Sequence, residues 1–233
     1  MTFSRLIPCA TCLALLIVAW SPTPLIAASV YGIVRAQGKP VPLSAQRSGK
    51  YKSRKHKFTE TVDYTAMKEF VVSIEGPLRG DVPQTPAKTV QVVVQRDARF
   101  DPRVMVIEKG TTVEWPNKDD IFHNVFSASE TKPFDLGLYK EEIKSITFEK
   151  PGRVDVFCSI HKNMSCIILV MDNPYYSKTD NKNRYRIDDI RPGTYTLKAW
   201  HERLPPQTRK ITITEDGDLE VDLLMGITGL PQY

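Results

Sequence analysis

The chain of 233 residues has few histidines and lacks the common motifs of phosphate and acyl chemistry. Four histidines are too few for machinery that needs many imidazoles, such as a multicopper oxidase cluster. The chain also has no Gly-rich phosphate-binding loop and no Gly-x-Ser-x-Gly nucleophile elbow. These absences argue against nucleotide binding at such a loop and against the common serine hydrolases.

Stretches that could form long helices are also missing. Seventeen prolines and twelve glycines are scattered among short runs rich in Val, Ile, Thr and Phe, a pattern typical of many short strands joined by turns. Since 41% of the residues are apolar, the chain can fill one or two packed cores. We therefore expect an all-β protein with two units of the size of a β-sandwich.

Only one long apolar run occurs, from Leu6 to Trp20, and it follows a single cation, Arg5. About 15 residues are too few to span a bilayer, which takes roughly 20, so we interpret residues 1–28 as a secretory signal peptide and a retained anchor as the weaker alternative. Cleavage is expected near Ala27 or Ala28. The mature protein is then periplasmic or secreted and keeps no transmembrane anchor.

The positive charge of the chain is concentrated in one segment. The net charge is +5, and residues 47–57 contain six Lys and Arg and no acid. This stretch has no hydrophobic periodicity and is interpreted as an exposed loop. It is either a solvated loop without a partner or a docking site for an anionic partner or a membrane. We do not expect a nucleic-acid partner.

A group of chemically suited side chains lies near the end of a predicted strand. Cys158, His161 and Met164 follow the strand RVDVFC at the spacing Cys-x2-His-x2-Met, so one tight loop presents a thiolate, an imidazole and a thioether. A trigonal His2Cys set with a weak axial Met defines a blue-copper electron-transfer site. His123, on an upstream strand candidate, is the natural donor of the second imidazole.

Three other interpretations compete with this one. Zinc could bind Cys158, His123 and His161, although a structural zinc site prefers four ligands without a thioether. A disulfide between Cys158 and Cys166 is permitted in an oxidising compartment. Otherwise Cys166 is a buried, inert thiol. A binuclear copper centre would need a second cysteine inside the loop, and Ser159 and Ile160 do not supply one.

The motifs WPNKDDIFHNVFS, KPFDLGLYK and ITFEKPGRVDVFCSIHKNM make residues 88–172 resemble the cupredoxins, the plastocyanin- and amicyanin-like blue copper proteins. The resemblance implies a Greek-key β-sandwich that holds one type 1 copper ion. It implies equatorial ligands His123, Cys158 and His161 and an axial Met164. It also implies that the side chain of Asn124 ties its strand to the cysteine loop.

The whole chain also resembles longer exported cupredoxin-like proteins of the methylamine-utilisation type, through DNPYY at 172–176 and PGTYTLKAWH at 192–201. Segments near both ends resemble the halves of a carboxypeptidase regulatory-like sandwich. We therefore divide the mature chain into 29–87, 88–172 and 173–233. The first of these is expected to pair with 178–225 in a second, discontinuous Ig- or transthyretin-like sandwich.

Together these features predict an exported type 1 copper protein that carries single electrons and catalyses no reaction itself. The expected partner is a redox protein, such as a c-type cytochrome or a periplasmic dehydrogenase. The alternatives are a non-redox binding or structural β-sandwich protein and a periplasmic copper storage or delivery protein.

Overall fold

The computed structural model describes residues 27–38, 63–75, 78, 90–215 and 217–226. Within these ranges the chain forms eighteen strands and one three-residue 3₁₀ helix, η2 (Tyr64–Ala66), so the predicted all-β fold is confirmed. Most of the predicted signal peptide and the basic stretch 47–57 lie outside the described residues. No helix in the described part of the chain is long and apolar enough to cross a membrane.

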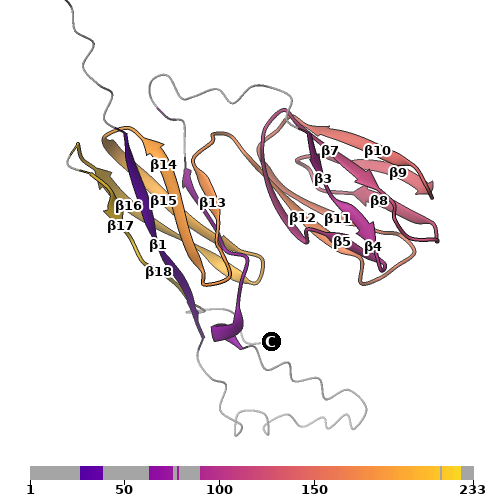
Figure 1. Cartoon of the computed structure of the whole chain (residues 1–233), viewed down its shortest axis with the longest axis horizontal. Helices are drawn as coiled ribbons and strands as arrows, with labels where there is room; N and C mark the ends of the chain where they lie inside the picture. The colour runs from indigo at the N-terminus through magenta and orange to yellow at the C-terminus, as the bar shows by residue number, and fades with distance from the viewer. Residues whose placement is uncertain (1–26, 39–62, 76–77, 79–89, 216, 227–233) are drawn as a thin grey trace, which may run out of the picture.

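The strands form two units, which lie side by side in Figure 1. We call the unit on the left the split sandwich, because its strands come from both ends of the chain. It contains β1 (Ala28–Gln37), β2 (Val71–Glu75), β13 (Tyr176–Lys178), β14 (Arg184–Ile190), β15 (Gly193–His201), β16 (Leu204–Ile213), β17 (Leu219–Glu220) and β18 (Leu223–Gly226).

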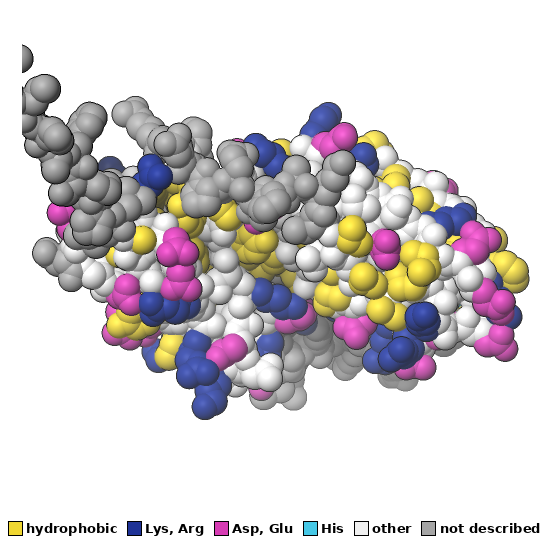
Figure 2. All heavy atoms as spheres, turned by 45° about the horizontal axis from the view of Figure 1, so that its top comes forward, with side chains coloured by type: hydrophobic (Ala, Val, Ile, Leu, Met, Phe, Trp, Pro, Cys, Tyr) yellow, Lys and Arg dark blue, Asp and Glu magenta, His cyan; other side chains and the backbone are white. Residues whose placement is uncertain are grey.

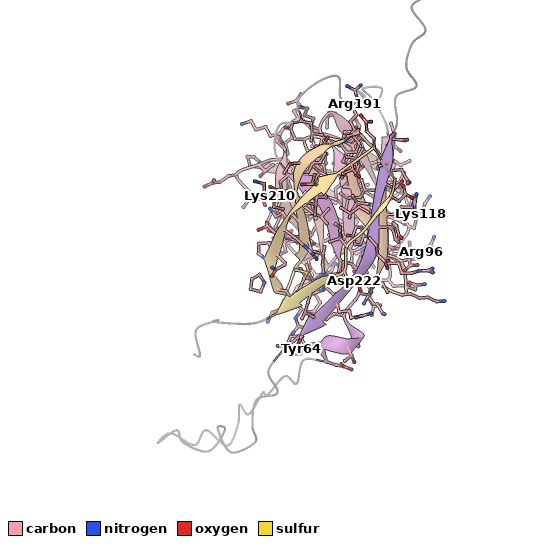
Figure 3. The ribbon with its side chains drawn as sticks, turned by 90° about the vertical axis from the view of Figure 1, so that its left-hand side faces the viewer. Tyr64, Arg96, Lys118, Arg191, Lys210 and Asp222 are labelled. Atoms are coloured by element: carbon pink, nitrogen blue, oxygen red, sulfur yellow. The ribbon has the colours of Figure 1, made fainter. Side chains whose placement is uncertain are left out.

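Both N-terminal strands occupy internal positions of the split sandwich. In one sheet β1 lies between β14 and the parallel strands β17 and β18, and in the other β2 lies between β13 and β15. Figure 3 looks onto this unit, with Asp222 beside β1. The carboxylate of Asp222 accepts a hydrogen bond of 2.9 Å from the amide of Ile33 on β1. The strands after residue 175 therefore depend on β1 and β2 to complete both sheets.

Alternation of side chains on β1 explains its central place. Val30 and Val34 are completely buried and point into the core of the split sandwich. Gly32 lies between them, where the chain approaches the next segment closely. A Cβ atom at Gly32 would lie 2.2 Å from the carbonyl oxygen of Val221, so this position accommodates only glycine.

The unit on the right in Figure 1, residues 90–171, is the inserted sandwich. It contains β3 (Val90–Val92), β4 (Val94–Arg96), β5 (Arg99–Asp101), β6 (Val104–Glu108), β7 (Thr111–Pro116), β8 (His123–Ser127), β9 (Phe134–Tyr139), β10 (Ile143–Phe148), β11 (Gly152–Phe157) and β12 (Ser165–Met171). One sheet has the order β6-β12-β11-β8-β9 and the other β10-β7-β3, with β4 and β5 as a separate hairpin.

Three elements differ from the sequence pattern, which indicates one strand over 89–95, no strand over 134–139 and a break between strands at 205–206. The run 89–95 forms two strands, because Val93 leaves the ladder and is completely buried. Strand β9 forms over 134–139, outside the strand candidates of the sequence. Strand β16 continues through Pro205 and Pro206, which were expected to end it. Because β16 lies at the edge of its sheet, prolines there remove no hydrogen bond from an inner ladder.

The two units meet through a small apolar cluster bordered by polar contacts. Val71 and Trp200 of the split sandwich pack against Val104, Ile167 and Leu169 of the inserted sandwich. In Figure 2 hydrophobic side chains lie near the middle of the molecule, where the units adjoin, and again on the unit at the right.

Two polar contacts border this cluster. An ion pair of 2.8 Å joins Arg103 to Glu202, and the ammonium of Lys178 donates to the carbonyl of Val104. The contact between the units therefore combines apolar burial with direct hydrogen bonds.

Candidate metal centre

His123 is the first residue of β8. It lies at the end of the inserted sandwich where β7 ends. Its side chain is completely buried, and its neighbour along the same face, Val125, is buried as well. A register shift follows between Asn124 and Phe126, where β8 pairs with β9. Such bulges redirect side chains and are common next to functional sites. Here the bulge accompanies an imidazole that points inward.

The Nε2 atom of His123 lies 2.7 Å from a carboxylate oxygen of Asp119, in the loop that joins β7 to β8. An ionised carboxylate only accepts hydrogen bonds, so this contact places the imidazole proton on Nε2 and leaves the lone pair on Nδ1 free for a metal. Asp119 is thus in a position to orient the His123 ring.

Asp119 is itself held by the hairpin of β4 and β5. The backbone amides of Asp97 and Ala98, at the tip of the hairpin, donate to its two carboxylate oxygens over 2.7 and 2.9 Å. Burial alone would raise the pKa of Asp119. The hydrogen bonds from Ala98, the His123 ring and Asp97 outweigh that effect and lower it.

Cys158 follows β11, where Val154 and Val156 alternate into the core, and it continues that buried face. Its loop is closed by backbone hydrogen bonds. The amide of Cys158 donates to the carbonyl of Met164 over 3.1 Å, and the amide of Met164 donates to the carbonyl of His161 over 3.0 Å. The sequence from Cys158 to Met164 therefore forms a compact turn that holds its side chains around one point.

The two histidines and the cysteine converge at that point. The Nδ1 atoms of His123 and His161 are 3.0 Å apart, and the Sγ atom of Cys158 lies 3.6 Å from Nδ1 of His161. All three ligand atoms fall within 4.8 Å of one another. Metal bonds of about 2.0–2.3 Å in a trigonal arrangement separate donor atoms by about 3.5–3.8 Å. The spacing thus fits a single metal ion.

Met164 is buried beside these donors. Only 1% of its surface is exposed, and it belongs to the same core cluster as Cys158 and Val156. The structure therefore places all four residues of the expected ligand set at one end of the inserted sandwich. Among the described residues, the His, Cys, Asp and Glu side chains that could bind a metal ion together at this end are His123, Cys158 and His161.

Asn124 has a role different from the expected one. Its side-chain amide donates to Asp135 on β9 over 2.6 Å, whereas its backbone amide faces the Sγ atom of Cys158 at 3.5 Å. The link between β8 and the cysteine loop is therefore made by the main chain. The side chain joins β8 to β9 instead.

The remaining cysteine and histidine of the described residues lie apart from this group. Cys158 and Cys166 are both free thiols in the structure, so the alternative disulfide is not formed. Burial in the core raises the pKa of the Cys166 thiol, as expected of an inert cysteine. His201 is buried in the split sandwich, where its ring lies 5.0 Å from that of Phe70.

Apolar side chains adjoin the candidate metal ligands on the outer surface. Phe122, directly before His123, is 57% exposed, and Ile160, directly before His161, is 52% exposed. Leu138, which pairs with Asn124 across the sheet, is exposed as well. His161 itself is partly exposed. The candidate metal centre thus lies just beneath a surface rimmed by apolar residues.

Sequence reasoning missed Asp119 and its partners. One signal was present: a carboxylate stands four residues before His123 in NKDDIFH. The hairpin amides that fix Asp119 had no local signal, because they lie 21 and 22 residues away.

Comparisons with known proteins give partial matches to each unit. Residues 170–221, from the end of β12 to just before β18 of the split sandwich, match the family model described as polysaccharide lyase family 4, domain II. This family differs from the carboxypeptidase regulatory-like one that the sequence resembles. No curated protein sequence matches the chain.

Among solved structures, a copper-containing nitrite reductase from Thermus scotoductus SA-01 is similar at 32% identity and a TM-score of 0.34, over 36% of this chain and 23% of that enzyme. A reduced amicyanin mutant is 26% identical (TM-score 0.33), over 35% of this chain and 82% of its own. A purple cupredoxin from Nitrosopumilus maritimus is 22% identical (TM-score 0.32), over 35% of this chain and 99% of its own.

Proposed function

We propose that the protein is an exported type 1 copper protein that carries single electrons between redox partners. The observation that carries the proposal is the convergence of Cys158, His123 and His161 on one point, with Met164 buried beside it. A thiolate, two imidazoles and a thioether form the donor set of an electron-transfer copper site. A bound copper ion would supply a one-electron Cu(I)/Cu(II) couple.

The donor set favours copper over zinc. A structural zinc site takes four strong ligands, whereas among the described residues only three His and Cys donors converge here. The carboxylate of Asp119 is already bound to Nε2 of His123 and to two backbone amides. A buried thioether completes the set instead, and this ligand suits the softer Cu(I) ion.

The residues around the site support electron transfer in two ways. Buried, hydrogen-bonded ligands keep their positions, so little rearrangement accompanies a change of charge. Cys158 would give the strong thiolate bond, and the amide of Asn124 points toward its sulfur. His161 is partly exposed within an apolar rim, which provides a short exit for electrons and a surface for a transient partner.

Redox titration of the copper-loaded protein tests this proposal against storage or delivery of copper. We expect the colour to disappear and return reversibly with one electron per copper, and copper to stay bound when a chelator is added to either state. Rapid loss of the Cu(I) form to a competing chelator would support delivery. Failure to bind copper at all would support a non-redox binding module.

A further inference from the structure

The hairpin of β4 and β5 presents two arginines directly opposite each other. Arg96 and Arg99 are register partners on either side of the turn formed by Asp97 and Ala98. Directly opposed residues have their Cβ atoms about 5 Å apart, and like charges in such a pair destabilise the hairpin. Both turn residues have positive φ values, 54° and 51°, which hold the turn tight. The structure thus maintains a repulsive pair at a fixed place.

A third cation joins them. The amide of Lys118 donates to the carbonyl of Gln95, which places Lys118 beside Arg96. All three side chains are exposed, and Figure 3 shows Arg96 and Lys118 pointing outward on the same side of the molecule. Within the described part of the chain, none of the three forms an ion pair. We call Arg96, Arg99 and Lys118 the cationic triad.

Nearby acids offset only part of the charge of the triad. The carboxylate of Asp119 is directed inward to His123 and to the hairpin amides. Asp120 pairs with Lys140 at 2.6 Å. Asp97 and Asp101 lie on the hairpin, but neither makes a salt bridge to the triad. Three exposed cations therefore stand against two exposed acids, Asp97 and Asp101, and a small excess of positive charge faces solvent.

Three hydrogen bonds connect the hairpin of the triad to the candidate metal centre. The hairpin tip holds Asp119 through the amides of Asp97 and Ala98, and Asp119 holds His123. Lys118 is the residue directly before Asp119. Figure 1 shows β4 and β5 together at the lower end of the inserted sandwich. The triad thus belongs to the same end of the unit as the copper ligands.

We infer that the cationic triad is a docking surface for an acidic redox protein. This inference rests on the proposed electron-transfer function and names the kind of partner for it. Charges at the edge of an apolar patch steer the approach of an oppositely charged partner, while the patch itself makes the close contact. Phe122 and Ile160 supply the apolar residues beside the ligands.

An acidic protein fits better than a membrane or a nucleic acid. Polybasic segments that bind anionic lipids contain about four to eight cations, and nucleic-acid surfaces extend over a longer basic stripe. The triad has three cations, with Asp97 and Asp101 nearby. A small cationic group next to a redox centre matches the weak, fast contacts of electron-transfer proteins.

Stopped-flow mixing of the copper-loaded protein with an acidic c-type cytochrome tests the inference. The variant Arg96→Ser/Arg99→Ser/Lys118→Ser should react about tenfold more slowly at low ionic strength, since steering changes on-rates by roughly 10- to 1,000-fold. At about 0.5 M salt, where screening is strong, the difference should fall to less than about twofold. With a basic cytochrome c the variant should react as fast as the wild type or faster.

A matched variant, Lys150→Ser/Lys182→Ser/Lys210→Ser, removes the same charge elsewhere. Lys150 lies at the opposite end of the inserted sandwich, because it follows β10 where that strand pairs with the start of β7. Lys182 and Lys210 are exposed on the split sandwich. This variant should react with the acidic cytochrome at close to the wild-type rate.

Line broadening in NMR spectra of the metal-free protein gives a readout that needs no copper. The acidic cytochrome should broaden signals near the triad in the wild type and not in the triad variant. Equal rates and equal broadening for both proteins would overturn the inference, even if the copper site forms. Triad-dependent binding to phosphatidylglycerol vesicles or duplex DNA, with unchanged cytochrome kinetics, would also overturn it. A failure of the proposed function would instead appear as a wild-type protein that does not bind copper.

Discussion

At the scale of single residues, two buried thiols have different roles. Cys158 lies 3.6 Å from Nδ1 of His161, whereas burial in the core raises the pKa of Cys166. Cys158→Ser should abolish the copper-thiolate colour, because it removes the only anionic soft ligand. Cys166→Ser should keep the colour and cost about 1 kcal/mol of stability. Absorption spectra of both variants with Cu(II) check this, and loss of colour in both would contradict the ligand assignment.

Asp119 is predicted to set the copper affinity through His123. Partners that orient a metal-binding histidine typically change metal affinity by about 10- to 100-fold when removed. Asp119→Ala should therefore weaken copper binding by that factor in competition with a chelator. Asp120→Ala is the control, since Asp120 is exposed and pairs only with Lys140. Equal affinities for the two variants would show that Asp119 does not position the ring.

Three of the four expected ligands have a local signal in the sequence. Cys158, His161 and Met164 share one loop, and a strand pattern fixes which way the cysteine points. The supports of the site were not predictable in this way. The amides that hold Asp119 come from a distant hairpin, and the role of Asn124 depends on where β9 lies. Both are set by the register of strands that only the folded chain brings together.

At the scale of elements, β1 depends on a glycine. Gly32→Ala would place a Cβ atom against the carbonyl of Val221, so the backbone of β1 or of its neighbour must shift. We expect a loss of about 3 kcal/mol, at the upper end for overpacked sites. Hydrogen-exchange protection of β1 measures the effect.

Gly217→Ala is the comparison within the same unit. Gly217 has a φ of 130° and nothing within 4 Å of an added Cβ, so the change brings backbone strain of only about 1–2 kcal/mol. If β1 loses no more protection in Gly32→Ala than in Gly217→Ala, the close packing of β1 on Val221 is not important for stability.

The elements that the sequence did not predict share one physical reason. Prolines end inner strands, yet β16 tolerates Pro205 and Pro206 because its outer edge needs no ladder hydrogen bonds. Likewise, Val93 separates β3 from β4 because its amide bonds to Glu114 of β7 while the next residues pair with β5. The residue pattern of one β-strand contains no information about which of its two edges pairs with another strand.

At the scale of the whole molecule, the two units should differ in how they fold alone. A fragment of residues 88–172 contains every strand of the inserted sandwich and should fold and bind copper. A fragment of residues 178–233 lacks β1 and β2, which are internal to both sheets, and should remain unfolded. Dispersion of amide signals in NMR spectra distinguishes the two states.

Fusing residues 28–75 behind residue 226 through a flexible linker provides the control. This rearranged chain restores β1 and β2 and should fold, because the closure of a surface loop costs little free energy. A stable, monomeric 178–233 fragment would contradict the interdependence of the strands in the split sandwich.

The visible spectrum of the purified mature protein after addition of Cu(II) tests the central claim most directly. A cysteine thiolate bound to Cu(II) in a trigonal site produces an intense charge-transfer colour that nitrogen and oxygen ligands alone do not give. The convergence of Cys158, His123 and His161 predicts a blue or green protein with one copper per chain. A colourless protein, or one with only weak bands, would contradict the type 1 copper assignment.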